Sequence, residues 1–264
     1  MILLAAIGIF IFATVSSMVG IGGGAFYVPI LLLLGLPFHT ATSTSVFIIL
    51  FMATVASVRY IKEKKTDIPL AAVAGSISFI SALIAGMFAN RIPLLPLKLL
   101  LIAVLLLSAL SMIFDIPVAG NRSEKRRGRF IWQREKEGER YFIGLPVLLP
   151  MKMLAGVFSA LLGIGGGIIY VPTFVILFGT PVAVAIGTST LITAGTSLAS
   201  FIGHTVAGDV RIDYALPFVI AGILGGIVGP YVSLKLRKEM LKRILGVILL
   251  TLVGVLVCRL VHSG

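Results

Sequence analysis

The chain has 264 residues, of which 58% are hydrophobic and only 12% are charged, and its mean hydropathy is +1.13. A charged share about half that of a soluble domain excludes an ordinary soluble globule, and the single cysteine excludes an intramolecular disulfide. The net charge of +12 does not indicate nucleic-acid binding, because eight of the 22 basic residues lie between Arg122 and Arg140 and the others flank apolar stretches. We therefore predict an all-α polytopic membrane protein.

Apolar segments follow one another along the chain, and we expect about 8–10 of them to lie in the membrane. A helix that crosses a bilayer needs about 20 apolar residues, and most of the segments are long enough. Two segments are about half that length, 25–36 and 168–178, and each follows a glycine cluster. The predicted segments are 2–19, 25–36, 41–58, 68–90, 96–114, 147–162, 168–178, 184–203, 212–234 and 244–261.

Residues 115–146 interrupt this pattern with charges of both signs and little apolar periodicity. We interpret them as a solvated, basic cytoplasmic linker. The linker divides the chain into a first membrane repeat, 1–114, and a second, 147–264.

The two halves repeat one another. Residues 20–29, GIGGGAFYVP, match residues 163–172, GIGGGIIYVP, at an offset of 143. After a slip of one residue, Gly35, Pro37, Thr44 and Ser45 match Gly179, Pro181, Thr188 and Ser189. The chain therefore contains an internal duplication of roughly 115 residues.

The basic residues predict how the repeats are oriented. If each glycine cluster is the tip of a hairpin that returns to its starting side, eighteen basic residues fall on one side of the membrane. Four fall on the other: Arg91, Lys98, Arg211 and Arg259. If each glycine-broken segment crosses once, the division is fifteen to seven. The positive-inside rule favours the first arrangement. It predicts inverted repeats, each led by a broken or re-entrant helical hairpin, with the linker inside and both termini outside.

The glycine triplets are the strongest functional signal. Glycine is unfavourable inside a helix, and irregular backbone in a bilayer is tolerated where protein buries it or where it lines a watery cavity. New short helices are expected to begin at Ala25 and Ile168, with unpaired N–H groups and positive dipole ends that favour an anion. The alternative is close helix packing through small residues. The predicted binding residues are Gly22, Gly23, Gly24, Ala25, Gly165, Gly166, Gly167 and Ile168.

Hydroxyl side chains form a second group. Thr44 and Ser45 in the first half, and Thr188 and Ser189 in the second, lie where the helix after each hairpin begins. They are candidate N-caps, or hydroxyl donors to a bound oxyanion, and the two roles are compatible. The second half carries further hydroxyls at helical spacing: Thr193, Thr196, Ser197 and Ser200.

Acidic residues are placed only in loops or at span ends, which argues against a metal-ion or carboxylate-coupled cation carrier and suits an anionic cargo. We predict no metal site, no cofactor and no enzymatic activity. A Ser189–His204 pair for an intramembrane protease has no supporting motif. His204, Arg211 and Tyr60 are candidates for coupling or gating, although for His204 the pattern favours the alternative of an interfacial polar cap.

The paired Gly-Ile-Gly-Gly-Gly-x-x-Tyr-Val-Pro stretches, each followed by a Gly-x-Pro turn and an Ala-x-x-Thr-Ser helix start, resemble the TauE/SafE family of membrane permeases. The resemblance covers both halves and excludes the linker. It implies a secondary transporter of sulfur-containing anions such as sulfite or organosulfonates. Ser43 in place of Gly187, and Tyr60 in place of His204, depart from strict symmetry and suggest that the second half contributes more to coupling.

These observations predict export of a small sulfur oxyanion across the cytoplasmic membrane by alternating access. The alternative is uptake, or proton-coupled transport of another small organic or inorganic anion. The expected partners are the anionic substrate and membrane lipids, with no nucleic acid, and a homodimer is left open.

Overall fold

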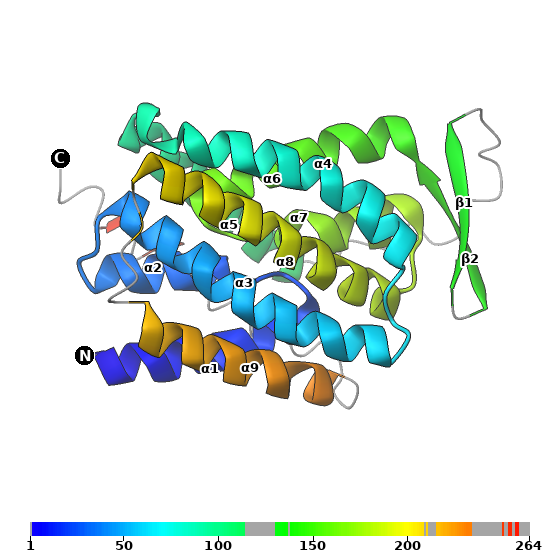
Figure 1. Ribbon diagram of the computed structural model, residues 1–264, viewed down its shortest axis with the longest axis horizontal. Coiled ribbons are helices and arrows are strands. Elements are labelled where there is room, and N and C mark those ends of the chain that lie inside the picture. The colour runs from blue at the N-terminus through cyan, green and yellow to red at the C-terminus, as the bar shows by residue number, and fades with distance from the viewer. Residues whose placement is uncertain are drawn as a thin grey trace.

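The computed structural model describes residues 2–113, 130–136, 138–208, 210, 215–233, 250, 253–254 and 257–258. It is a helical protein with one small β-hairpin (Figure 1). The first half contains α1 (Ile2–Val19), α2 (Gly24–Leu33), α3 (Phe38–Lys62), α4 (Ile68–Met87), a 3-10 turn (Ala89–Arg91) and α5 (Leu94–Ile113). The second contains α6 (Leu145–Leu162), α7 (Gly167–Pro172), a π-helical turn (Thr173–Leu177), α8 (Val182–Ala207) and α9 (Leu216–Ser233).

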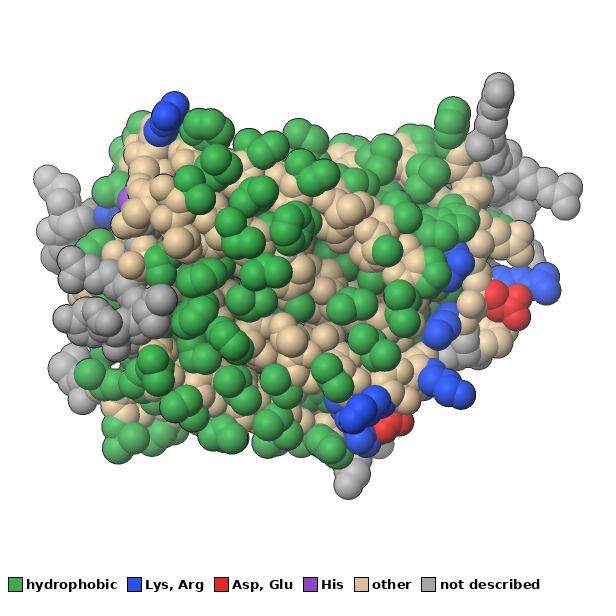
Figure 2. Space-filling view, in the orientation of Figure 1, with side chains coloured by type: hydrophobic (Ala, Val, Ile, Leu, Met, Phe, Trp, Pro, Cys, Tyr) green, Lys and Arg blue, Asp and Glu red, His purple; other side chains and the backbone are tan. Residues whose placement is uncertain are grey.

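Within the described ranges, six helices are long and apolar enough to cross a membrane: α1, α3, α4, α6, α8 and α9. Figure 2 shows hydrophobic side chains over the middle of the face in view, with most Lys and Arg side chains at the end of the molecule where the hairpin lies. This distribution is that of a multi-pass membrane protein. The predicted span 244–261 falls almost entirely outside the described residues.

Two helices form the centre. About two thirds of the residues in the apolar windows of α3 and α8 are buried, against one third for α1 and α4. The most extensive helix contacts join the two halves: α4 with α8, α1 with α9, α3 with α8, and α4 with α6. The first helix of each half therefore packs on the third long helix of the other half: α1 on α9, and α6 on α4.

Close contacts along these pairs fix the helix directions. Thr188 near the start of α8 binds Asp67 at the start of α4, and Asn90 beyond α4 binds Ala207 at the end of α8. The two helices are therefore parallel, and both run opposite to α3, which a short loop joins to α4 (Figure 1). Parallel contacts also join α1 to α9, α3 to α9, and α6 to α4.

Small residues permit these close approaches. A Cβ on Gly86 of α4 would lie 3.1 Å from Gly203 Cα of α8, and one on Gly226 of α9 would lie 2.5 Å from the Met52 carbonyl oxygen of α3. Small residues in membrane helices allow backbones to pack through van der Waals contact where lipid provides no hydrophobic drive.

The linker contains regular structure that the sequence did not predict. Strands β1 (Ile131–Lys136) and β2 (Glu139–Gly144) pair antiparallel, with Ile131 opposite Gly144 and Lys136 opposite Glu139. Alternate residues of β2, Tyr141 and Ile143, are buried against the membrane helices. The hairpin leads directly into α6, so it is a fixed part of one end of the molecule.

Candidate functional site

Both glycine clusters interrupt a membrane helix, as the sequence predicts. In the first half, α1 ends at Val19 and α2 begins at Gly24; in the second, α6 ends at Leu162 and α7 begins at Gly167. The N-cap residues Gly23 and Gly166 have φ of 84° and 71°, a left-handed conformation that glycine adopts without the penalty of a side chain. The clusters are therefore breaks, and not unbroken rods.

The two breaks pack against each other in a reciprocal way. A Cβ on Gly24 would lie 1.9 Å from the carbonyl oxygen of Gly163, and one on Gly167 would lie 2.6 Å from that of Gly20. The second contact is the first with the halves exchanged, because 24 matches 167 and 20 matches 163 in the sequence repeat. The two backbones thus meet with no side chain between them, which requires glycine at both positions. The glycine clusters therefore interrupt the helices and also allow close packing, although the sequence alone presents close packing as an alternative.

Serine side chains tie each break to the opposite half. Ser45 on α3 donates to the Gly163 carbonyl at 2.6 Å, and Ser189 on α8 donates to the Gly20 carbonyl at 2.8 Å. These are again matched positions of the repeat. Both hydroxyls therefore bind carbonyl groups of the breaks and hold the two breaks in register.

The amide groups at the start of α2 and α7 differ from those farther along these helices. Regular hydrogen bonding resumes at Phe26 and Ile169, whose N–H groups donate to Gly23 and Gly166. Within the described residues no acceptor is found for the preceding four N–H groups of either segment, 22–25 and 165–168. All of these residues are buried. Because buried N–H groups are rarely left unpaired, this set of donors is unusual and is suited to an anion.

The two other predicted hydroxyls, those of Thr44 and Thr188, differ in their hydrogen bonding. Thr44 is buried and its Oγ1 has no hydrogen-bond partner in the described part of the chain, whereas Thr188 Oγ1 accepts from the N–H of Asp67. Thr188 therefore contacts the loop before α4. The N-cap interpretation is wrong: α3 begins at Phe38 and α8 at Val182, so the hydroxyl runs lie one to two turns inside these helices.

Tyr60 and His204 occupy matched positions, and each contacts a backbone carbonyl group of its own half. The Tyr60 hydroxyl donates to the Ser17 carbonyl at 2.8 Å, and His204 Nε2 lies 2.9 Å from the Ala160 carbonyl oxygen. Each side chain joins the long central helix of its half to the helix before its break. His204 is fully buried, so it is not an interfacial cap. Ser189 and His204 also bond to different carbonyl groups, which gives no support to a hydrolytic pair.

Two further hydroxyls on α8 have no partner in the described ranges. Thr193 and Ser197 are fully buried, and their oxygens form no hydrogen bond. Thr193 Cγ2 lies 3.2 Å from the Cβ position of Gly22 and 3.3 Å from that of Gly165, so this side chain touches both breaks. The polar face seen in the sequence of the second half therefore reaches the junction.

The position of Lys152 differs from the one expected when basic residues were assigned to the two sides of the membrane. That assignment placed it with the linker on the inner surface, but it lies seven residues inside α6 and is fully buried. Its Nζ is 4.2 Å from the ring centre of Tyr170 and 3.7 Å from that of Phe174. A lysine near a span end is normally expected to reach water, so the sequence alone gave no signal for this placement.

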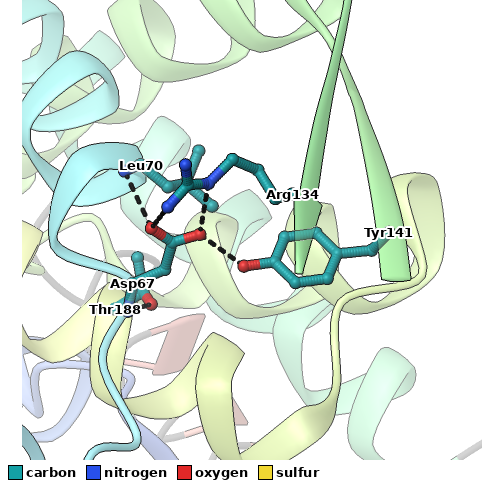
Figure 3. Close-up of polar contacts among 5 residues, drawn as sticks. All are labelled: Asp67, Leu70, Arg134, Tyr141 and Thr188. Atoms are coloured by element: carbon teal, nitrogen blue, oxygen red, sulfur yellow. Dashed lines mark hydrogen bonds and ion pairs between the residues drawn. The ribbon is translucent and has the colours of Figure 1, made fainter. Parts of the chain in front are cut away.

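A charged cluster at the hairpin end was also missed (Figure 3). Arg134 of β1 binds the Asp67 carboxylate through Nε at 2.9 Å and Nη2 at 2.6 Å, while the Tyr141 hydroxyl and the Leu70 N–H also donate to it. Burial alone would raise the pKa of Asp67, but these donors hold that pKa below its ordinary value. Burial and the bond to Asp67 raise the pKa of Tyr141. The cluster fastens the linker hairpin to the loop between α3 and α4.

Among the described residues, no group of His, Cys, Asp and Glu side chains is arranged to hold a metal ion. Arg211, proposed for gating, lies outside the described residues.

The comparisons with known proteins agree with this architecture. The family model described as "Sulfite exporter TauE/SafE" matches residues 4–256, which include both breaks. The chain belongs to the TauE/SafE family. This TauE/SafE protein is also 27% identical over 276 residues to the "Probable membrane transporter protein YunE" of Bacillus subtilis (strain 168), covering 100% of this chain and 98% of the relative. No solved structure gives a significant match. Family and relative identify the chain as a multi-pass membrane transporter.

Proposed function

We propose that this transporter exports a small sulfur oxyanion, sulfite or an organosulfonate, and binds it at the junction of the two helix breaks. One observation carries the proposal: two matched sets of buried N–H groups, which have no acceptor among the described residues, lie in the segments where the breaks touch. Paired helix N-termini in a low-dielectric interior bind an anion without a full positive charge. Hydroxyl groups of Thr44 and Thr193 would add donors beside the amides.

We infer that the two halves are inverted repeats across the membrane. The matched helices α3 and α8 run in opposite directions along the long axis, which supports this orientation (Figure 1). Basic residues gather at the hairpin end, so that end is proposed to face the cytoplasm (Figure 2). The junction then lies between two similar halves, as alternating access requires.

The membrane potential favours the proposed direction. A dianion that leaves a negative-inside cell gains about 4.6 kcal/mol per 100 mV, twice the value for a single charge. Export therefore needs less coupling to another gradient than uptake does. Uptake or proton-coupled transport of another anion would show the opposite dependence on potential, or a dependence on the pH gradient.

Flux measurements test the substrate and the direction. Purified protein in liposomes should carry ³⁵S-labelled sulfite with saturation, and unlabelled ethanesulfonate should compete, whereas protein-free liposomes should show only the leak. A potassium diffusion potential that is negative on the loaded side should accelerate efflux. Saturable flux of another anion, without flux or competition by any sulfur oxyanion, would refute the proposed substrate.

Labelling tests the orientation. In a Cys258→Ser background, a Lys62→Cys protein should react with a membrane-impermeant maleimide only in inside-out vesicles, and a Val206→Cys protein, changed at the exposed matched position of the second half, only in right-side-out cells. Reaction of both from the same side would contradict the inverted arrangement.

A further inference from the structure

Lys152 is a buried amine that pairs with no carboxylate among the described residues. Its side chain is fully buried, and within the described ranges its Nζ has neither a hydrogen-bond acceptor nor a carboxylate in ion-pair contact. Removing an ammonium group from water costs several kcal/mol unless it is paired. Ionisable residues inside a membrane protein are retained at this cost mainly where they act on a substrate or an ion.

Two aromatic rings hold the ammonium group. Nζ lies 4.2 Å from the ring centre of Tyr170 and 3.7 Å from that of Phe174, both within the range of a cation–π contact. Such contacts recover only part of the desolvation cost. The rings accept no conventional hydrogen bond from Nζ, so its N–H donors have no acceptor among the described residues.

The ring of Tyr170 also reaches the second break. Its Cζ and hydroxyl oxygen lie 2.7 Å from the Cβ position of Gly166, and its hydroxyl is 3.1 Å from Thr196 Oγ1. One side chain thus contacts both the cation and the backbone that carries the free amides. Lys152 is therefore linked to the proposed site through the ring of Tyr170, on the side where α6 follows the hairpin.

The first half shows that this packing does not need a lysine. The matched tyrosine, Tyr27, lies under Gly23 in the same way and bonds to the Met52 sulfur at 3.2 Å. The position that matches Lys152 is Ile9, which is equally buried. An apolar side chain therefore satisfies the fold at this place, and the cation needs another explanation.

We propose that Lys152 is a binding position for the transported anion on the hairpin side of the breaks. Its ammonium group forms an ion pair with the sulfur oxyanion as the anion moves between the cytoplasmic end and the amides of the breaks. This inference rests on the proposed anion transport and adds a cationic step to it. It also makes the route asymmetric, because the first half offers Ile9 at the equivalent place.

Four proteins test the inference: wild type, Lys152→Met, Lys152→Arg and the matched control Ile9→Met. Sulfite flux is measured in liposomes as a function of concentration, and thermal unfolding in detergent confirms that each variant is folded. Lys152→Met should raise the KM for sulfite about ten- to hundredfold, the range expected for loss of a hydrogen-bonded charge. Lys152→Arg should stay within a few-fold of wild type, and Ile9→Met should match it.

A wild-type KM in folded Lys152→Met would overturn the inference while leaving the proposed function intact. Absence of sulfite flux from the wild type would instead refute the proposed function. If Lys152→Met does not fold, the neutral variant Lys152→Gln, which retains a polar end, replaces it under the same criteria.

Discussion

The two helix breaks have the same backbone and different surroundings. Their matched glycines have φ of 74° and 67°, 84° and 78°, and 84° and 71°. At four matched positions around them, the first half places an apolar side chain where the second places a polar one. The matched pairs are Ile9 and Lys152, Ile49 and Thr193, Met52 and Thr196, and Ala53 and Ser197.

This difference separates two tasks. The duplicated backbone provides the amide donors and the contact between halves, so it must be the same on both sides. The side chains need not be the same, and the polar ones gather in the second half. In the proposed function, the duplicated backbone supplies the amide donors, and the side chains that differ between the halves supply the further chemistry.

The shared backbone should be the least tolerant part. In Gly24→Ala and Gly167→Ala, the new Cβ would overlap a carbonyl group or backbone carbon of the opposite break, which cannot move without displacing the whole segment. We expect a loss of more than about 3 kcal/mol in the free energy of unfolding, or no folded protein. The control is Gly195→Ala on α8, where a Cβ meets nothing within 4 Å. Equal stability of Gly24→Ala and Gly195→Ala in thermal melts would contradict the close contact.

Loss of the ion pair at the hairpin end should have the next largest effect on the free energy of unfolding. The position of Asp67 corresponds to Arg211 in the sequence of the second half, so the two matched positions carry opposite charges. Asp67→Asn should lower the free energy of unfolding by about 2 kcal/mol, because it removes the ion pair between the buried Asp67 carboxylate and the partly buried Arg134. Glu63→Gln is the control, since the exposed Arg59–Glu63 pair is worth at most about 0.5 kcal/mol.

Acid should have the same effect as Asp67→Asn. The pKa of Asp67 is lower in the folded protein than in the unfolded chain, so its contribution is complete above its ordinary pKa and is lost as the pH falls through the lower folded value. The difference in melting temperature between wild type and Asp67→Asn should therefore shrink as the pH falls below about 4. A constant difference across that range would show that the carboxylate does not fasten the hairpin.

The serine ties should have smaller and nearly equal effects. Ser45→Ala and Ser189→Ala each remove one buried hydrogen bond to a carbonyl of the opposite break, and we expect a loss of about 1 kcal/mol from each. The two losses should be nearly equal because the two breaks have the same backbone conformation. Urea or thermal unfolding that assigns several kcal/mol to one tie and nothing to the other would break the symmetry.

The polar side chains should affect stability least and transport most selectively. Thr193→Val and Ser197→Ala give the second break the apolar character of the first, and each removes a buried hydroxyl that has no partner in the described residues. We expect the free energy of unfolding to change by less than about 1 kcal/mol while sulfite flux falls about tenfold. Thr205→Val, at the exposed end of α8, is the control. Unchanged flux in both variants would place the substrate elsewhere.

Sequence predicted the helix breaks because glycine triplets and short apolar segments have few other uses in a bilayer. The sequence also identified Tyr60 and His204 as matched positions, but it gave no indication that both contact carbonyl groups. Two features depend on contacts between residues that are distant in the chain. One is the burial of Lys152 between rings of α7 and the following π-helical turn, and the other is the ion pair of Arg134 with Asp67. A charge near a span end and a charged linker give no local sign of either. The division at 114 and 147 remains a prediction.

The location of the bound anion tests the central claim most directly. Selenite has the shape and charge of sulfite, and its selenium atom gives an anomalous signal in crystals of the protein grown or soaked with it. We predict one peak within hydrogen-bonding distance of the N–H groups of 22–25 and 165–168. A saturating selenite concentration that inhibits sulfite flux but gives its peak far from both breaks would contradict the account.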